Sequence, residues 1–226
     1  MNDYVLLSER FSRFKEISRE EETIINLIRQ NILVNENCKI LDIGSNRGAI
    51  SHALQKNTNN ITLIDVEDFD IKTGARFFKG KWEDLNLDEK FDVILASHIW
   101  GHFHYEKTTR KSFEKALNSL TPKGKIILCY NSNDDFVGKL VNFCNTIFND
   151  FQYDIFDESL LDNPKIVNFS LTLKCKDFGE LADLVQVLII VPDTEFESKK
   201  AEIESFLRNN LEKPEFAINQ KLVIIG

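Results

Sequence analysis

The feature that most restricts the fold of this chain is a series of short apolar segments with helical patterns between them. The segments are KILDI at 39–43, ITLID at 61–65, FDVILA at 91–96 and KIILCY at 125–130. They have the length of strands but lack the alternating polar residues of a strand with one exposed face. We therefore expect both of their faces to be buried, as in a parallel sheet.

Helical patterns fill the intervals between these strands. They cover residues 46–56, 108–120 and 136–148, and the sequence TPKG at 121–124 is expected to end the second helix. Alternating strands and helices predict right-handed βαβ units, and therefore an α/β fold with a Rossmann-like, doubly wound sheet. The other predicted elements are a helix at 19–33, a strand at 166–175, helices at 177–190 and 199–211, and a strand at 221–225.

Length and composition favour one domain over residues 1–226, with a core at 36–150 between an N-terminal segment (1–35) and a C-terminal part (151–226). The 42% of apolar residues, including 18 Phe, suffice for a hydrophobic core. A net charge of -8 argues against a nucleic-acid partner, because that affinity comes from basic patches. The four dispersed cysteines indicate reduced thiols and no zinc knuckle.

Membrane and export signals are missing from the sequence. The N-terminus has no signal peptide, and no apolar run approaches the roughly 18 residues that a transmembrane helix needs. We therefore expect a soluble, cytoplasmic protein with no membrane partner.

The segment KILDIGSNRGAIS at 39–51 carries the first sign of a ligand site. Asp42 closes a buried strand, Gly44 turns the chain, and Gly48 stands where the next helix begins. Glycines here would let a ligand approach the backbone, and the helix N-terminus would offer N–H groups. An ordinary tight turn has the same pattern, so the residues at the ends of the following strands are needed to distinguish a ligand site from a simple turn.

The ends of the following strands fit a nucleotide site. Asp65 closes the second strand, where a carboxylate accepts hydrogen bonds from ribose hydroxyls in doubly wound sheets; a helix cap is the alternative. Beyond a third strand at Phe77 and Phe78, Trp82 is expected to cover a purine face, and Glu83 or Asp84 to meet its amino group. A partly buried surface tryptophan is the alternative there.

The order of these motifs resembles that of class I S-adenosylmethionine-dependent methyltransferases. KILDIGSNRG has an acidic residue before its first glycine, LTPKGKIIL is similar to the element before the family's fifth strand, and KLVIIG to its last strand. Nicotinamide-binding proteins instead favour G-x-G-x-x-G. Asn46 replaces the usual middle glycine. The resemblance implies seven strands and S-adenosylmethionine as cofactor, with S-adenosylhomocysteine as product. The residues that it implies for the cofactor are Asp42, Gly44, Ser45, Asn46, Gly48, Asp65, Val66, Trp82, Glu83 and Ser97.

Both ends of the chain resemble histamine N-methyltransferase and its bacterial relatives. YVLLSERFSRFKEISREE at 4–21 is similar to the N-terminal lid of that family, and residues 181–216 to its small C-terminal helical insertion. The resemblance implies a small-molecule substrate with nitrogen as the expected methyl acceptor, and it places Glu20 at the family's pocket glutamate. The residues expected to line the substrate pocket are Tyr4, Phe11, Phe14, Trp100 and Asn131.

Three histidines, His98, His102 and His104, follow the fourth predicted strand. A neutral imidazole can take a proton from an acceptor or orient it, so we predict catalytic roles for His98 and His102, together with Glu20. A metal site is the alternative, but the cluster contains no Asp or Cys, and methyl transfer from a sulfonium needs no metal. A loop histidine that faces solvent is the structural alternative.

Three other functions remain open on the sequence. They are an O- or C-methyltransferase of a small metabolite, a protein-methylating enzyme, and a methyltransferase-like binding protein without turnover. Binding of S-adenosylmethionine is common to the first two, so measuring it separates an enzyme from a protein that has lost the site.

Overall fold

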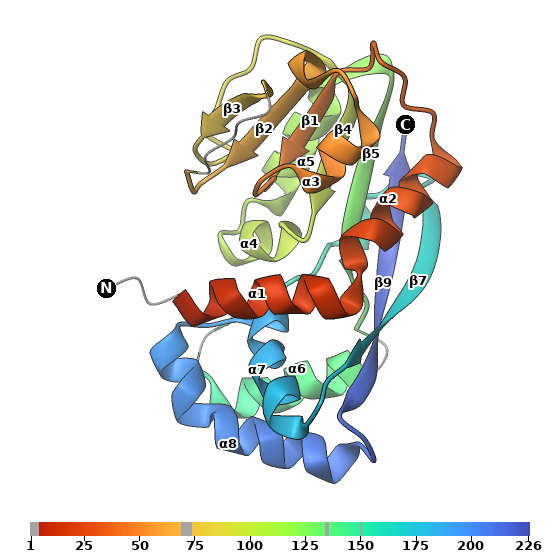
Figure 1. The fold of residues 1–226 in the computed structure, drawn as a ribbon. Helices are drawn as coiled ribbons and strands as arrows, with labels where there is room; N and C mark the ends of the chain where they lie inside the picture. Colours follow the sequence, from red (N-terminus) through yellow and green to blue (C-terminus); the bar gives the residue numbers. More distant parts are fainter. Residues whose placement is uncertain (1–4, 69–73, 134–135, 150) are drawn as a thin grey trace. The chain divides into compact units, whose positions relative to one another are not determined.

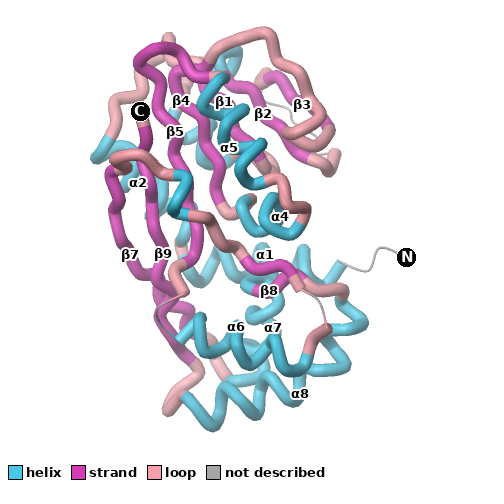
Figure 2. Tube along the Cα trace, turned by 180° about the vertical axis from the view of Figure 1, so that it is seen from behind, coloured by secondary structure: helices cyan, strands magenta, loops and turns pink. Residues whose placement is uncertain are grey.

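The computed structural model describes residues 5–68, 74–133, 136–149 and 151–226, and Figures 1 and 2 show the chain from opposite sides. The strands are β1 (Ile40–Ile43), β2 (Ile61–Asp65), β3 (Arg76–Lys79), β4 (Phe91–Ser97), β5 (Leu120–Asn131), β6 (Gln152–Tyr153), β7 (Lys165–Lys174), β8 (Ile189–Ile190) and β9 (Glu215–Ile225). The helices are α1 (Val5–Ser18), α2 (Glu20–Asn31), α3 (Ala49–Leu54), α4 (Trp100–Tyr105), α5 (Thr109–Asn118), α6 (Phe136–Ile147), α7 (Phe178–Leu188) and α8 (Asp193–Asn210).

Seven strands of the described chain form one sheet in the order β3-β2-β1-β4-β5-β9-β7. Parallel pairing joins β1 to β2 and β4, β2 to β3, and β4 to β5. Strand β9 runs in the opposite direction (Figure 1). The strand order reverses between β1 and β4, where ligands bind in doubly wound sheets. The predicted Rossmann-like α/β fold with seven strands is confirmed.

Helices cover both faces of the parallel part of the sheet. Helix α3 lies on the face toward the viewer in Figure 1, and α5 lies on the opposite face, in front in Figure 2. Every residue of β1 is buried, and so are the first four of β2. The lack of polar alternation in these segments therefore reflects burial on both faces.

Two compact units divide the described residues, and neither is a continuous stretch of chain. The sheet unit comprises Glu21–Tyr130, Ile155–Asn168 and Lys221–Gly226. The helical unit comprises the described residues of Met1–Glu20, Asn131–Asp154 and Phe169–Gln220. Each unit has its own hydrophobic core. None of the helices in the described ranges combines the length and the apolar character required to cross a bilayer.

Helix α1, the predicted lid, is bonded into the helical unit. The carboxylate of Asp193, at the start of α8, accepts hydrogen bonds from the amides of Leu6 and Leu7 at 2.8 and 3.1 Å. It also accepts one from Nε2 of Gln186 at 2.9 Å. Amides in the first turn of a helix have no partner within the helix, so Asp193 caps α1 from a distant part of the chain.

An arginine reinforces this attachment. Arg10 on α1 binds Asp183 at 2.6 Å and also contacts Gln186 and Glu197. Its guanidinium carbon lies 4.8 Å from the centre of the Phe196 ring. Helix α1 therefore belongs to one packed body with α7 and α8.

Replacement of Asp193 by alanine should destabilise the helical unit by about 2 kcal/mol, the magnitude of a lost cap with charge-assisted hydrogen bonds. Burial alone would raise the pKa of Asp193, but the bonds from Gln186, Leu6 and Leu7 outweigh it and lower the pKa. The stabilisation is therefore present above the unfolded-state pKa and is lost as the pH falls through the lower folded-state pKa.

Urea unfolding of wild type and Asp193→Ala at neutral and acidic pH measures this difference, which should shrink in acid. Glu195→Ala is the matched control, because Glu195 is the other acidic residue in the first turn of α8. Equal losses in the two variants would leave only a helix-dipole effect and contradict the cap.

Several element boundaries differ from those predicted. Helix α5 ends at Asn118, and TPKG lies within β5, where the register with β4 shifts between Phe91 and Val93. Helix α8 begins at Asp193, six positions before the predicted 199, because Pro192 and the acidic residues of the first turn favour a helix start there. Helix α4 was not predicted.

Candidate active site

The turn between β1 and α3 is built from left-handed residues. Gly44, Asn46 and Gly48 have φ angles of +68°, +50° and +70°. The amides of Gly44 and Ser45 donate to the carbonyl of Ile64 at 2.9 and 3.1 Å, which attaches the turn to β2. Asparagine visits the left-handed region more readily than most residues, because its short side chain bonds locally. Asn46 can therefore stand where the family resemblance expects glycine.

Crowding by side chains explains why this turn needs its two glycines. A Cβ at Gly44 would lie 2.8 Å from Cδ1 of Ile99, and one at Gly48 would lie 2.9 Å from both Cδ atoms of Leu63. The prediction attributed these glycines to the approach of a ligand. In the structure an added Cβ would also meet neighbouring parts of the protein, so the shape of the turn requires these glycines, and their role toward a ligand stays a prediction.

Asp42 ties β1 to the helix that follows. Its side chain is buried, and its Oδ2 accepts a hydrogen bond from Oγ of the fully buried Ser51 on α3 at 2.9 Å. This contact joins the two elements on either side of the turn, β1 and α3. Ser51 was not predicted, and a serine at the third position of the helix after D-x-G is the signal that could have indicated it.

Asp65 lies at the end of β2 and meets the same turn. Its Oδ2 accepts the amide of Asn46 at 2.8 Å, and its Oδ1 accepts the amide of Glu67 at 3.1 Å. A carboxylate has about four acceptor positions, so these two bonds leave capacity for hydroxyl groups. Val66, the next residue, is 58% exposed and provides an apolar surface beside that carboxylate.

The prediction for Trp82 is wrong. Its side chain is 2% exposed, its Nε1 donates to the carbonyl of Ser112 at 3.1 Å, and Nζ of Lys115 lies 4.3 Å from the ring centre. The ring is therefore part of the core and has no exposed face for a purine. Glu83 is half-buried, and its carboxylate accepts a hydrogen bond from Oγ1 of Thr108 at 2.7 Å.

His98 follows β4 at the carboxyl edge of the sheet, directly after the half-buried Ser97. It has a φ of +54°, and its amide donates to the carbonyl of Cys129 at 2.9 Å. Its Nε2 lies 3.5 Å from Sγ of Cys129, which is 1% exposed. Since the next residue, Ile99, reaches Gly44, the segment that carries His98 lies against the glycine turn. Cys129 was missed, because one cysteine at a strand end is no signal by itself.

Helix α4 carries the other residues predicted near His98. Trp100 is 1% exposed, donates from Nε1 to the carbonyl of Ala96 at 3.1 Å, and packs edge-on against Phe103 and Phe156. It belongs to the core and does not form the predicted pocket wall. His102 is half-buried. Within the described ranges, no group of three or more His, Cys, Asp or Glu residues could hold a metal ion.

A buried polar cluster lies in the helical unit. It contains Glu20 at the start of α2, Asn131 at the end of β5, and Gln220 in β9, which are 6%, 7% and 1% exposed. Nε2 of Gln220 donates to Oε1 of Glu20 at 2.5 Å and to Oδ1 of Asn131 at 3.1 Å. The structure thus joins two of the predicted residues and adds Gln220. The signal for it was the position of Gln220 midway between Ile218 and Leu222, on the face of β9 that alternation predicts to be buried.

The aromatic residues predicted for the substrate pocket differ in position. Phe14 is 2% exposed in the core of the helical unit, so its prediction as a pocket residue is wrong. Phe11 is half-buried, with Nζ of Lys15 4.6 Å from its ring centre. Tyr4 lies outside the described residues.

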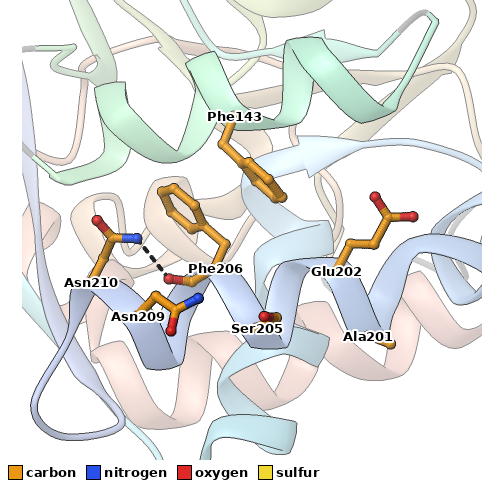
Figure 3. A pocket seen from close by; sticks show the side chains of 7 residues that line it. All are labelled: Phe143, Ala201, Glu202, Ser205, Phe206, Asn209 and Asn210. Carbon is orange, nitrogen blue, oxygen red and sulfur yellow. Dashed lines mark hydrogen bonds between the residues drawn. The ribbon is translucent and has the colours of Figure 1, made fainter.

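A groove of about 450 Å³ lies between α6 and α8 of the helical unit (Figure 3). The residues that line it are Phe143, Ala201, Glu202, Ser205, Phe206, Asn209 and Asn210. The rings of Phe143 and Phe206 are stacked with centres 4.3 Å apart. The groove contains none of the predicted site residues and no residue from a strand end, so we do not assign the active site to it.

Comparisons with known proteins agree with this geometry. A family model described as "Methyltransferase domain" matches residues 34–163. Malonyl-[acyl-carrier protein] O-methyltransferase of Calditerrivibrio nitroreducens is 26% identical over 172 residues, which are 73% of this chain and 66% of that enzyme. The chain therefore spans slightly less than two thirds of this relative.

Two solved structures share the fold. The YcgJ protein of Bacillus subtilis superposes with a TM-score of 0.63 at 14% identity, over 90% of this chain and 97% of that one. Coclaurine N-methyltransferase, solved with N-methylheliamine and S-adenosylhomocysteine, gives a TM-score of 0.53 at 12% identity, over 90% and 71% of the two chains. The family match covers more than half of the sequence, and the chain belongs to the methyltransferase domain family, whose members use S-adenosylmethionine.

Proposed function

We propose that this chain is an S-adenosylmethionine-dependent methyltransferase that acts, as one domain, on a small-molecule acceptor. The single observation that carries the proposal is the carboxylate of Asp65, which lies at the end of β2 and is bonded to the left-handed turn through Asn46. This is the position where doubly wound sheets bind the ribose of a nucleotide. Membership of the methyltransferase domain family supports it.

Several residues of the sheet unit would each bind a different part of S-adenosylmethionine. Asp65 accepts hydrogen bonds from the ribose hydroxyls, and the exposed side chain of Val66 covers one face of the base. The turn at Gly44 and Ser45 borders the remainder of the cofactor. S-adenosylmethionine supplies a methyl group on a positively charged sulfonium, and holding an acceptor in line with it is the main contribution that a protein can make.

Two residues of the catalytic prediction keep their proposed roles. His98 stands at the carboxyl end of β4, beside the glycine turn, where it would meet the acceptor. His102 is half-buried on the next helix and would support it. Glu20 belongs to the helical unit, where Gln220 and Asn131 hold its carboxylate in one orientation, and its catalytic role stays a prediction.

The acceptor atom has two candidates. Oxygen is favoured by the relative, which is named an O-methyltransferase. Nitrogen is favoured by Glu20, because a buried carboxylate attracts an N–H group or a cation, and the same residue carries the resemblance to histamine N-methyltransferase.

Ligand-induced stabilisation followed by a turnover assay tests the proposal. S-adenosylmethionine and S-adenosylhomocysteine should each raise the melting temperature, with a gain of about 2.7 kcal/mol at one hundred times Kd. Release of S-adenosylhomocysteine is then measured with amines, imidazoles, carboxylic acids and malonyl-acyl carrier protein. No shift at millimolar nucleoside would reject the cofactor site. A shift without turnover on any acceptor would indicate a binding protein.

A further inference from the structure

We propose that Thr108 and Lys115 are positioning residues, which hold Glu83 where its carboxylate accepts a hydrogen bond from the amino group of adenine and selects that base. The inference rests on the proposed function, because it concerns the base of S-adenosylmethionine. The sequence predicted a contact between this amino group and Glu83 or Asp84, but it did not indicate what would fix either carboxylate. Thr108 and Lys115 lie outside the motifs that resemble the family.

The ammonium group of Lys115 is used entirely by the segment that follows β3. This half-buried lysine on α5 donates from Nζ to the carbonyls of Trp82 and Leu85, and to that of Glu83 at 3.3 Å. An ammonium has three N–H donors, so each donor has an acceptor in this one segment. Hydrogen bonds from a charged donor are stronger than those between neutral groups. Lys115 therefore fixes the backbone of Glu83 and of the residues on both sides of it.

Thr108, the N-cap residue of α5, fixes the side chain of the same glutamate. Its Oγ1 donates to Oε1 of Glu83 at 2.7 Å. Within the described ranges Oε2 of Glu83 has no hydrogen bond, so this second oxygen is available as an acceptor. Asp84, the other carboxylate predicted for the amino group, is exposed. Of the two acidic residues, Glu83 is therefore the one with a defined direction.

The contacts with this segment come from one face of α5. Thr108, Ser112 and Lys115 are four and three positions apart, so they lie on the same side of the helix. The carbonyl of Ser112 accepts a hydrogen bond from Nε1 of Trp82 at 3.1 Å, and the ring of Trp82 is 2% exposed. Glu83 thus comes directly after a residue that is anchored in the core.

The other end of the segment is attached to the proposed ribose residue. The amide of Gly80 donates to the carbonyl of Asp65 at 2.8 Å, and Asp65 is paired with Lys79 in the register of β2 and β3. All of these residues belong to the sheet unit. A base is bonded directly to its ribose, so a ribose held by Asp65 would bring the base to the segment that contains Glu83.

A carboxylate distinguishes adenine from a base that carries a carbonyl group instead of the amino group. The amino group of adenine donates hydrogen bonds, whereas hypoxanthine has an acceptor oxygen at the same position. An ionised carboxylate only accepts hydrogen bonds, so it binds the amino group and repels the carbonyl oxygen. Glu83 would therefore favour S-adenosyl compounds over S-inosyl compounds.

The affinities of two nucleosides measure this selection. Isothermal titration calorimetry on the full-length protein gives Kd for S-adenosylhomocysteine and for S-inosylhomocysteine. We expect the wild type to bind the adenosyl compound about a hundredfold more tightly. Glu83→Gln should lose most of this preference, because an amide can turn a donor toward the carbonyl, and Asp84→Asn should keep it. Equal affinities of the wild type for the two compounds would overturn the inference but leave the cofactor site in place.

Variants of the two positioning residues separate positioning from packing. Thr108→Val keeps the shape of the side chain and should lower the preference about tenfold, whereas Thr108→Ser should retain it, because serine also has a hydroxyl donor. Lys115→Met keeps the apolar stem and should lower the preference by a similar factor. Thr109→Val and Lys111→Met are the matched controls, since both residues lie on α5 and neither side chain has a hydrogen bond within the described part of the chain. Both controls should keep the full preference.

Urea unfolding of the same variants supplies the contrast. If Thr108→Val and Lys115→Met lower stability but keep the full preference for the adenosyl compound, the two residues only support the fold and the proposal fails. Because each residue is tested separately, a variant that does not fold leaves the other to decide. A wild type that binds neither compound would refute the proposed function, and this inference with it.

Discussion

Asp65→Ala is expected to weaken the binding of S-adenosylmethionine about a hundredfold or more. The carboxylate would accept two ribose hydroxyls, and hydrogen bonds to a charged group contribute about 1.5–3 kcal/mol each. The variant also removes the partner of the Asn46 amide, which lies 2.8 Å from Oδ2, so the turn loses its attachment to β2. Isothermal titration calorimetry with S-adenosylmethionine and S-adenosylhomocysteine measures the change in Kd.

Two variants control this experiment. Asp68→Ala removes a nearby carboxylate with a side chain that is 73% exposed, and it should bind the cofactor as the wild type does. Asp65→Asn keeps one acceptor oxygen and should give an intermediate Kd. If Asp65→Ala melts normally and still binds with wild-type affinity, the ribose assignment is wrong and the nucleoside is held elsewhere.

Gly48→Ala is expected to destabilise the sheet unit by about 2–4 kcal/mol. Left-handed backbone costs a residue with a Cβ about 1–2 kcal/mol, and overpacking of a filled core adds about 1–3 kcal/mol. Both apply here, because Gly48 has a φ of +70° and its added Cβ would lie 2.9 Å from Leu63, which is fully buried. Chemical denaturation measures the free energy of unfolding.

Gly179→Ala serves as the comparison. Gly179 lies in α7 without a positive φ, and a Cβ there would meet side-chain oxygens of Asp177 at 3.2 Å and of Glu204 at 3.9 Å. It should change stability by less than about 1 kcal/mol, since alanine is the better helix former. A mild effect of Gly48→Ala, equal to that of Gly179→Ala, would show that the turn can rearrange and that the glycine is not required for its shape.

The core strands could be predicted because burial on both faces leaves a direct trace in the sequence. A mainly apolar segment without polar alternation, such as ITLID, is typical of a strand buried on both faces, and it forms β2. The position of Asp65 follows from the same logic, because Asp65 is the last residue of β2. The residue that ends a buried strand is fixed in space by the strand, and its side chain reaches the edge of the sheet.

Side chains beyond the strand ends were harder to predict. Trp82 and Trp100 were assigned to ligand surfaces, yet both are buried with bonded Nε1 groups. A large aromatic ring that follows a strand can cover either the core or a ligand. Only the packing of the surrounding side chains determines which of the two it covers. Gln220 and Cys129 were missed for a related reason, because their partners, Glu20 and His98, lie 200 and 31 positions away.

The order of strands has a consequence for biosynthesis. Strand β9 comes last along the chain but occupies an interior place, between β5 and β7. During synthesis β7 therefore leaves the ribosome before β9. Until β9 follows, the edges of β5 and β7 that β9 will join lack their backbone partner. Until Glu215–Ile225 emerges, those edges are available to other nascent polypeptides, and a chaperone that shields extended backbone would protect the half-finished sheet.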